Sequence, residues 1–242
     1  MIEEALSELT VPGTLRVGTN LGNILLVTGT SETGDPQGVS PDMAAAIAAR
    51  LGVAISYVTY PMAGEVADGA GRDEWDIGLI AVEPKRAEKI SFCAPYVEIE
   101  SSYLVPENSH LQSVEDVDQP GVRIAVADRA AYDLYLSRTL KHATLHRATG
   151  LPGAFKLFVS EKLDALAGLV PALMDNAKNL PGSRVLDGGF SAVRQTIGTK
   201  PGNTALKAVA EQFIAEAKES GLVAELIEKH GVKGKLHVAS SA

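Results

Sequence analysis

The feature that most constrains this chain is the alternation of strand-like and helix-like segments along its 242 residues. Short apolar or β-branched runs predict strands at 15–19, 55–60, 75–81, 122–127, near 145, at 163–167 and at 183–186. Helices are predicted between them at 41–51, 62–71, from 84, and at 131–142, 153–160 and 171–179. Alternation of this kind is typical of parallel sheets covered by helices, so the predicted fold class is α/β.

The helix predicted at 41–51 has recognisable signals at both ends. Ser40 precedes Pro41 and is a plausible N-cap, while Gly52 stands just past the last helical residue. Residues 20–40 are rich in Gly, Thr, Ser and Asp and have no clear period, so we expect a loop there.

Two long extended segments, 98–105 and 192–199, each join one α/β block to another. This is the pattern expected of a double crossover between two lobes. We therefore predict lobe 1 at 1–101, lobe 2 at 102–190, and a return to lobe 1 at 191–242 with helices at 203–218 and 222–229.

Charge and composition exclude several classes of partner. The net charge is −8, only 5% of residues are aromatic, and there is no block of Lys and Arg. Nucleic acid and anionic membrane surfaces are therefore not expected partners. The first residues, MIEEALSELTVPG, have neither the basic start nor the apolar stretch of a secretory signal, so either the protein is cytoplasmic or a signal has been removed.

Ligands of parallel sheets bind where the strands reach their carboxyl ends and helices begin. In this chain that rule selects four stretches: 20–24, 80–86, 128–132 and 168–171.

An ordered set of short motifs carries a family resemblance. The stretches are LRVGT at 15–19, GVSPDMAAAIAARLG at 38–52, WDI at 75–77, PKRAEKISFCAPY at 84–96, GVRIAV at 121–126, KLDA at 162–165 and GTKPGNTAL at 198–206. Each is weak alone, but in this order the chain resembles type II periplasmic solute-binding proteins of the amino-acid-binding branch (bacterial extracellular solute-binding proteins, family 3).

The resemblance implies two lobes that close on a small solute by a hinge motion, in a periplasmic protein that serves an ABC importer. It implies a membrane permease as partner, a monomer, no cofactor and no catalysis. It further implies that Arg86, which follows the strand at 75–81, grips a ligand carboxylate. A guanidinium fits a carboxylate with two parallel donors. The alternative is a solvated surface pair with Glu83, three residues earlier.

The chain departs from the family's pattern at several of these positions. The Thr or Ser that usually precedes the Arg is replaced within Ala81-Val82-Glu83-Pro84, a stretch that looks shortened. In lobe 2 the usual Gly-Thr/Ser-Thr turn is replaced by Asp128-Arg129-Ala130-Ala131-Tyr132. A helix beginning there still offers backbone N–H groups to an anion, which Asp128 would repel unless it is a cap.

The family's acid that pairs with a ligand's amino group is expected near Gly168 and Leu169, and neither can serve. Either Asp128 or Glu83 takes that task, or the ligand has no amino group. The solute is therefore expected to be a small carboxylate, either an amino acid or an organic acid.

Four further residues are candidates for the site. The amides of Asn20 and Asn23 suit either a ligand or a turn. Tyr132 suits either a cover over the ligand or the core, and Gln195 lies on a crossover strand that often borders the ligand in this family.

Other groups are given ordinary structural interpretations. Cys93, the only cysteine, is expected to be a buried small hydrophobe. His142 and His146 need not share a face, so no metal site is predicted. Asp73, Glu74 and Asp76 are expected to form a solvated turn.

Two other functions compete with transport. One is an enzyme on the same scaffold, resembling cyclohexadienyl dehydratase, with Glu83 as a general acid beside Arg86. The other is a sensory ligand-binding module.

Overall fold

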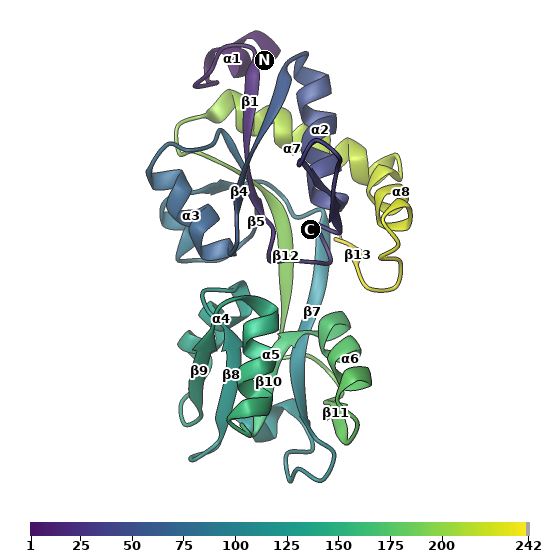
Figure 1. The fold of residues 1–242 in the computed structure, drawn as a ribbon. Coiled ribbons are helices and arrows are strands. Elements are labelled where there is room, and N and C mark those ends of the chain that lie inside the picture. The colour runs from purple at the N-terminus through teal and green to yellow at the C-terminus, as the bar shows by residue number, and fades with distance from the viewer. Residues whose placement is uncertain (241–242) are drawn as a thin grey trace. The chain divides into compact units, whose positions relative to one another are not determined.

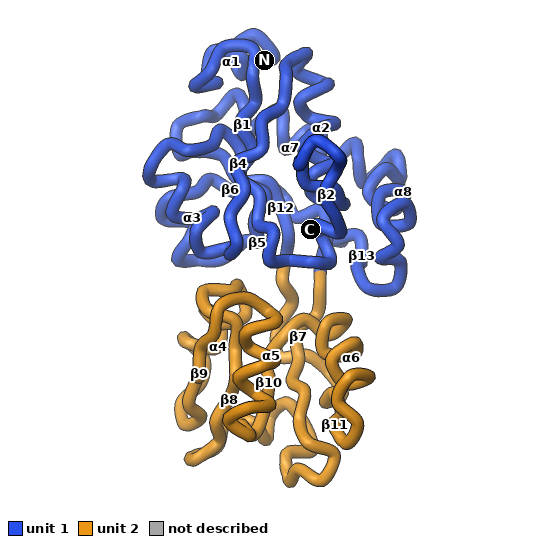
Figure 2. Tube along the Cα trace, viewed as in Figure 1, with its two compact units in different colours: residues 1–98, 194–242 blue, residues 99–193 orange. Residues whose placement is uncertain are grey.

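The computed structural model describes residues 1–240, whose contacts divide the chain into two compact units (Figure 2). Unit 1 holds Met1–Glu98 and residues 194–240, and unit 2 holds Ile99–Val193. Two strands, β7 (Val97–Pro106) and β12 (Ser191–Thr199), contribute residues to both units. Each unit is a sheet flanked by helices (Figure 1), so the predicted α/β class is confirmed.

The sheet of unit 1 has the order β4-β1-β5-β12, and its first three strands are parallel. They are β1 (Thr14–Asn20), β4 (Ala54–Tyr60) and β5 (Ile77–Ala81). β12 runs antiparallel to β5 and also pairs with β6 (Ser91–Phe92), while β13 (His237–Val238) pairs with the start of β7.

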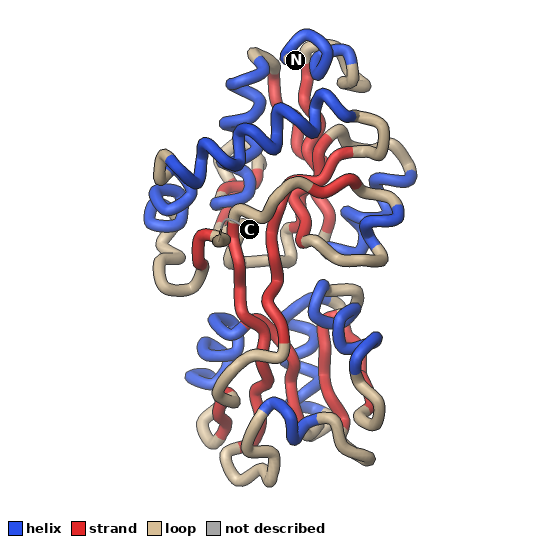
Figure 3. The backbone as a smooth tube through the Cα atoms, turned by 180° about the vertical axis from the view of Figure 1, so that it is seen from behind, coloured by secondary structure: helices blue, strands red, loops and turns tan. Residues whose placement is uncertain are grey.

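Helices cover this sheet, and Figure 3 shows the longest, α7, running across its strands. The helices of unit 1 are α1 (Ile2–Ser7), α2 (Val39–Leu51), α3 (Ala63–Gly71), the 3₁₀ turn η1 (Arg86–Glu88), α7 (Thr204–Glu219) and α8 (Leu222–Lys229). α7 packs against α1, and α8 against α2, so the C-terminal helices belong to unit 1.

Unit 2 has the order β7-β10-β8-β9, with β8, β9 and β10 parallel and β7 antiparallel to β10. Its other strands are β8 (Arg123–Ala127), β9 (Thr144–Ala148), β10 (Ala165–Leu169) and β11 (Ser183–Val185), which pairs with β7. Its helices are the 3₁₀ turn η2 (Val114–Val117), α4 (Ala131–Thr139), α5 (Gly150–Ser160) and α6 (Val170–Asn179).

The core of unit 1 is centred on Trp75, whose indole is fully buried and donates from Nε1 to the Val66 carbonyl at 2.9 Å. Two glycines make room for the ring. A Cβ added at Gly18 would lie 2.6 Å from the indole Cδ1, and one at Gly78 would lie 3.0 Å from Cη2. These positions on β1 and β5 therefore have to stay without a side chain.

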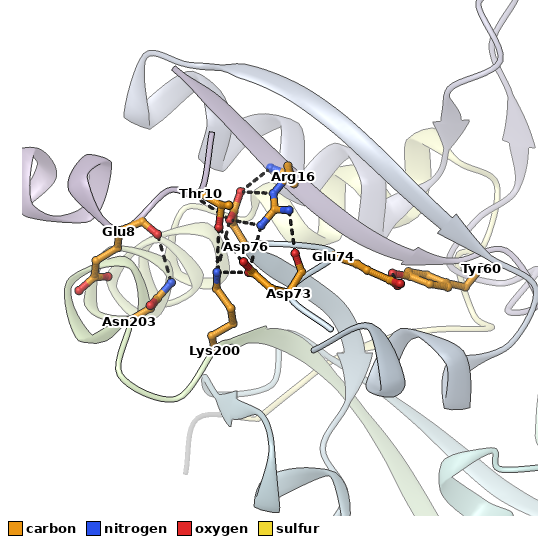
Figure 4. A network of polar contacts seen from close by, with 9 residues as sticks. All are labelled: Glu8, Thr10, Arg16, Tyr60, Asp73, Glu74, Asp76, Lys200 and Asn203. Carbon is orange, nitrogen blue, oxygen red and sulfur yellow. Dashed lines mark hydrogen bonds and ion pairs between the residues drawn. The ribbon is translucent and has the colours of Figure 1, made fainter. Parts of the chain in front are cut away.

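The acidic turn before β5 differs from the prediction, because Asp76 is fully buried. Figure 4 shows its carboxylate within a network of polar contacts that includes Arg16 and Thr10. Its carboxylate accepts from the Arg16 guanidinium at 2.9 Å and from the backbone N–H groups of Arg16 and Thr10. Asp73 contacts Arg16 and Lys200. Glu74 accepts from the Tyr60 hydroxyl at 2.6 Å. The prediction of a solvated turn was wrong because the partners of these acids, Arg16 and Lys200, come from distant parts of the sequence. Arg16 lies on β1 and Lys200 lies in the chain before α7.

Two helix boundaries and one predicted loop also differ. α2 begins at Val39 with Gly38 as its N-cap, so Ser40 is not the cap. A Cβ on Gly38 would lie 2.2 Å from the Leu26 carbonyl oxygen, which explains the glycine. α4 ends at Thr139, short of the predicted 142. The predicted loop at 20–40 includes a small hairpin of β2 (Gly29–Thr30) and β3 (Pro36–Gln37).

Among residues 1–240, no helix combines the length and the apolar content that a membrane crossing would need.

Candidate functional site

The predicted site residues lie at or shortly after the carboxyl-terminal parts of strands, with one group in each unit. The unit 1 group comprises Asn20, Asn23, Ala81, Glu83, Arg86 and Gln195. The unit 2 group comprises Asp128, Ala130, Ala131, Tyr132 and Gly168.

Strand pairing brings part of the unit 1 group together. Ala81 is the last residue of β5 and is paired with Gln195 on β12, while Asn20 ends the neighbouring parallel strand β1. Because β1 and β5 run in the same direction, their carboxyl ends share one edge of the sheet. Ala81, Gln195 and Asn20 therefore lie along that edge.

Arg86 and Glu83 are both buried, with exposures of 5% and 2%. The Arg86 guanidinium donates from Nη1 to the Ala81 carbonyl at 3.0 Å. The Glu83 carboxylate accepts from the backbone N–H groups of Lys85 at 2.8 Å and Arg86 at 3.2 Å. The shortened segment after β5 is thus a tight turn capped by Glu83, and the alternative of a solvated surface pair is wrong.

Gln195 is buried beside a polar pair that the sequence analysis did not select. The Tyr96 hydroxyl and the Ser40 hydroxyl are 2.7 Å apart, and the Tyr96 backbone N–H donates to the Gln195 carbonyl at 3.0 Å. Burial raises the pKa of Tyr96, and hydrogen bonds with Ser40 and Gln195 offset part of that rise. Ser40 was assigned to a helix cap, which hid this contact with a residue 56 positions away.

The two asparagines organise the loop that follows β1. Asn20 Oδ1 accepts from the Gly22 backbone N–H at 2.9 Å, and Asn23 Oδ1 accepts from that of Leu25 at 3.2 Å. Both oxygens therefore perform the turn role that was one of the two interpretations.

In unit 2, the turn between β8 and α4 is held by Asp133, which was not among the predicted residues. Asp133 is 1% exposed and accepts from the backbone N–H of Arg129 at 2.8 Å and from Arg147 Nε at 3.1 Å. Arg129 has a positive φ of 57°, as this turn requires. The sequence could have indicated Asp133, because an acidic residue in the first turn of a predicted helix is favoured by the positive end of the helix dipole.

Asp128 and the two alanines lie at the start of α4. Ala130 is the N-cap and Ala131 the first helical residue, so Asp128 is not the cap. Asp128 Oδ1 lies 3.8 Å from Arg147 Nε, and its side chain is 38% exposed. Arg147 therefore contacts both carboxylates, Asp128 and Asp133.

Tyr132, one residue further along α4, is 3% exposed. Among residues 1–240 its hydroxyl has no hydrogen-bond partner. Burial raises the pKa of the phenol, and the neighbouring Asp133 carboxylate raises it further. The hydroxyl is therefore a neutral group at physiological pH.

Gly168 lies inside β10, which extends two residues beyond its predicted end. A Cβ at this position would lie 2.9 Å from Leu173 Cδ2 on α6, and the adjacent Leu169 is 3% exposed. Gly168 can therefore offer only backbone atoms to a ligand.

Neither a metal nor a reactive thiol is indicated by the described residues. No three His, Cys, Asp or Glu side chains within 1–240 are grouped so as to hold a metal ion. Cys93 is 4% exposed, and burial raises the pKa of its thiol.

The model of "Bacterial extracellular solute-binding proteins, family 3" matches residues 15–233. This chain belongs to that family. The solute-binding protein therefore has the family's role of binding a solute, as its motifs predicted. A search of curated proteins finds no match.

Solved structures agree on the fold. A mutant of the arginine-binding protein ArgBP from T. maritima is 23% identical, with a TM-score of 0.77 over 93% of this chain and 98% of that one. The cysteine-binding protein from Campylobacter jejuni is 19% identical, with a TM-score of 0.78 over 100% and 95%. An ancestral amino-acid-binding protein, AncCDT-1, described as a precursor of cyclohexadienyl dehydratase, is 23% identical, with a TM-score of 0.76 over 94% and 97%. The two-lobed type II fold predicted from the motifs is confirmed.

Proposed function

We propose that this protein is the substrate-binding component of an ABC importer, that it works in the periplasm as a monomer, and that its solute carries a carboxylate. The observation that carries the proposal is Arg86, a buried guanidinium at the carboxyl end of β5 in a member of a solute-binding family. A bound carboxylate would accept from its planar fork, and contacts with both units would favour a closed form that a membrane permease recognises.

The rest of the unit 1 group supports a polar ligand of modest size. Gln195 and Asn20 stand at the ends of strands adjoining Ala81. In unit 2, α4 directs the N–H groups at its start toward the carboxyl end of β8, where an anion would be favoured.

Plain α-amino acids are expected to bind weakly. Gly168 and Leu169 provide no carboxylate for an amino group, and Asp128 and Asp133 both contact Arg147. The arginine and cysteine ligands named for similar structures therefore do not transfer to this chain.

A thermal-shift screen against amino acids, organic acids and aromatic acids tests the proposal. A solute present at 100 times its dissociation constant should stabilise the protein by about 2.7 kcal/mol. A chain that none of these carboxylates stabilises would contradict the proposal, and micromolar binding of a plain α-amino acid would contradict the expectation of weak binding.

A second candidate function is catalysis on the same scaffold. Glu83 is buried and lies within the same tight turn as Arg86, which is where a general acid beside a carboxylate clamp would stand. Against this, Glu83 Oε2 already accepts two backbone hydrogen bonds and caps the turn. A product detected by mass spectrometry on incubation with cyclic carboxylates, and lost in Glu83→Gln, would favour the enzyme.

A further inference from the structure

Three large apolar side chains are exposed where the parallel strands of unit 1 reach their carboxyl ends. Leu21 is 42% exposed and directly follows β1, Val82 is 38% exposed and directly follows β5, and Ile24 is 57% exposed in the loop after β1. They are three of the nine large apolar side chains that are exposed among residues 1–240. Single exposed apolar side chains are ordinary, but several that gather at one place mark a binding surface.

Strand pairing makes Leu21 and Val82 neighbours. β1 and β5 are adjacent parallel strands, and their register, carried to the ends of both strands, sets Leu21 opposite Ala81, the residue before Val82. Neighbouring strands lie about 4.8 Å apart. On its other side Leu21 is tied to β4, since its backbone N–H donates to the Tyr60 carbonyl at 2.9 Å. The exposed side chains therefore lie along the ends of three adjacent strands.

The loop that carries Ile24 lies against the turn after β4. A Cβ added at Gly22 would lie 2.5 Å from the Pro61 carbonyl oxygen, so the two backbones are in close contact. Pro61 is exposed as well, and neither 20–28 nor 60–64 contains a charged residue. We call this exposed surface the apolar edge, and its members are Leu21, Ile24, Pro61 and Val82.

The buried polar groups of unit 1 adjoin one end of the apolar edge. The Arg86 guanidinium donates to the Ala81 carbonyl at 3.0 Å, and Val82 is the next residue along the chain. Gln195 is paired with Ala81 from the opposite side. A carboxylate held by Arg86 would therefore have apolar side chains beside it, on a surface that continues from β5 across β1 to β4.

We propose that the apolar edge binds the body of the solute, and that the solute is a carboxylic acid with an uncharged aliphatic or aromatic chain. This inference rests on the proposed function, because it takes Arg86 as the group that binds the carboxylate. An apolar chain would leave water together with the side chains of the edge, which is favourable in proportion to the area buried. A charged chain would lose water there without gaining a hydrogen-bond partner.

Straight-chain acids from propanoate to hexanoate test the inference by calorimetry. Each added methylene should tighten binding about fourfold until the edge is covered. Hexanoate should bind more tightly than 6-aminohexanoate and hexanedioate, which have as many carbons but end in a charge. Likewise, 3-phenylpropanoate should bind more tightly than 3-(4-carboxyphenyl)propanoate. The dicarboxylates are included because Lys85, an exposed cation in the turn after β5, would attract a second carboxylate.

Two variants change the edge itself. Val82→Thr adds a hydroxyl at nearly constant shape, and Ile24→Thr shortens an exposed side chain and makes it polar. Each should lower the affinity for hexanoate about threefold to tenfold, and the affinity for propanoate by less, so the gain per methylene shrinks. Both positions are exposed, so the melting temperature of the unliganded protein should stay within about 2 °C of wild type.

Val11→Thr is the matched control for Val82→Thr. Val11 is 43% exposed, but it precedes β1 and so lies at the opposite edge of the same sheet. Its substitution should leave every affinity unchanged.

Tighter binding of an acid with a charged end would overturn the inference and leave the assignment of Arg86 standing. Wild-type affinity for hexanoate in Val82→Thr or Ile24→Thr would do the same, as would an equal loss for every acid, because such a loss does not depend on the solute's chain. If none of these acids binds but another carboxylate stabilises the protein in the thermal-shift screen, the inference fails and the proposed function stands. If no carboxylate binds, both fail.

Discussion

Arg16 and Asp76 are bonded in both directions at the start of two neighbouring strands. The Arg16 backbone N–H donates to the Asp76 carboxylate at 3.0 Å, and the Asp76 backbone N–H donates to the Arg16 carbonyl at 2.9 Å. Arg123 and Asp164 repeat both bonds in unit 2, at 2.8 Å and 3.0 Å. In each case the same Arg also donates to the carbonyl of a residue with positive φ, Asp73 or Lys162. The two units thus share one construction, an Arg–Asp clamp, which ties β1 to β5 in unit 1 and β8 to β10 in unit 2.

The two clamps should differ in strength because their burial differs. Asp76 is fully buried and its partner Arg16 is 17% exposed, whereas Arg123 and Asp164 are 44% and 35% exposed. We expect Asp76→Asn to cost about 3 kcal/mol, since it leaves a largely buried guanidinium with only the exposed Asp73 as a charge partner. Asp164→Asn should cost less than about 1 kcal/mol. Urea unfolding at pH 7 measures both, and equal losses would contradict the burial argument.

The same aspartate should give the protein a pH-dependent stability. Burial pushes the pKa of Asp76 upward, but hydrogen bonds from Arg16 and Thr10 outweigh that push and hold the pKa below its ordinary value. Its contribution is therefore complete above about pH 4 and is lost as the pH falls through the lowered value. Between pH 7 and pH 3, wild type should lose more stability than Asp76→Asn. Parallel curves would show that Asp76 does not contribute.

Arg86→Ala should weaken solute binding by about two to three decades, because a carboxylate drawn out of water would lose its charge partner. Arg86→Lys should restore only part of the affinity, since lysine lacks the fork. Arg86 also donates to the Ala81 carbonyl and is 5% exposed, so some stability of unit 1 should be lost as well. Calorimetry on the folded variants measures the affinity, and a change within about threefold would remove Arg86 from the site.

Gly18→Ala should destabilise unit 1 by about 1–3 kcal/mol, because its Cβ would lie 2.6 Å from the Trp75 ring. The matched control is Gly29→Ala, where the nearest atom is 3.7 Å from the added Cβ. Trp75 is the only tryptophan, so its fluorescence reports the unfolding of both variants directly. Equal midpoints for the two would show that the ring has room to move.

Cys93 should resist thiol reagents in the native protein. It is 4% exposed, and burial raises its pKa, so little thiolate is available to react. We expect slow labelling by iodoacetamide at pH 8 and rapid labelling in urea. As the sequence has one cysteine, the labelling rate follows a single site. Rapid labelling under native conditions would mean that β6 and the chain after it open readily.

Helices and strands were predictable from the sequence where the local hydrophobic pattern matches the way the element packs in the fold. The buried run of β5 and the amphipathic helices α7 and α8 are such cases. Boundaries failed where a distant contact decides them. The chain continues β10 to Leu169 because β7 offers Ser101 and Ser102 as partners. Ser40 is helical because Gly38 allows a tight approach to Leu26.

The candidate site also has features that the sequence predicted and features that depend on distant contacts. The position of Arg86 after a buried strand follows from the order of elements, but its burial and its bond to Ala81 depend on how Glu83 caps the turn. Asp133 escaped notice because its role depends on Arg147, which comes from the neighbouring strand β9.

The tight packing around Gly168 also limits how this protein could change its preference among solutes. Any side chain at that position would have its Cβ 2.9 Å from Cδ2 of the buried Leu173, so a carboxylate there has to displace that leucine side chain. Gly168→Asp should therefore be less stable than Gly168→Asp combined with Leu173→Ala. Evolution toward an amino-binding pocket at this position is thus tied to the size of the residue at 173.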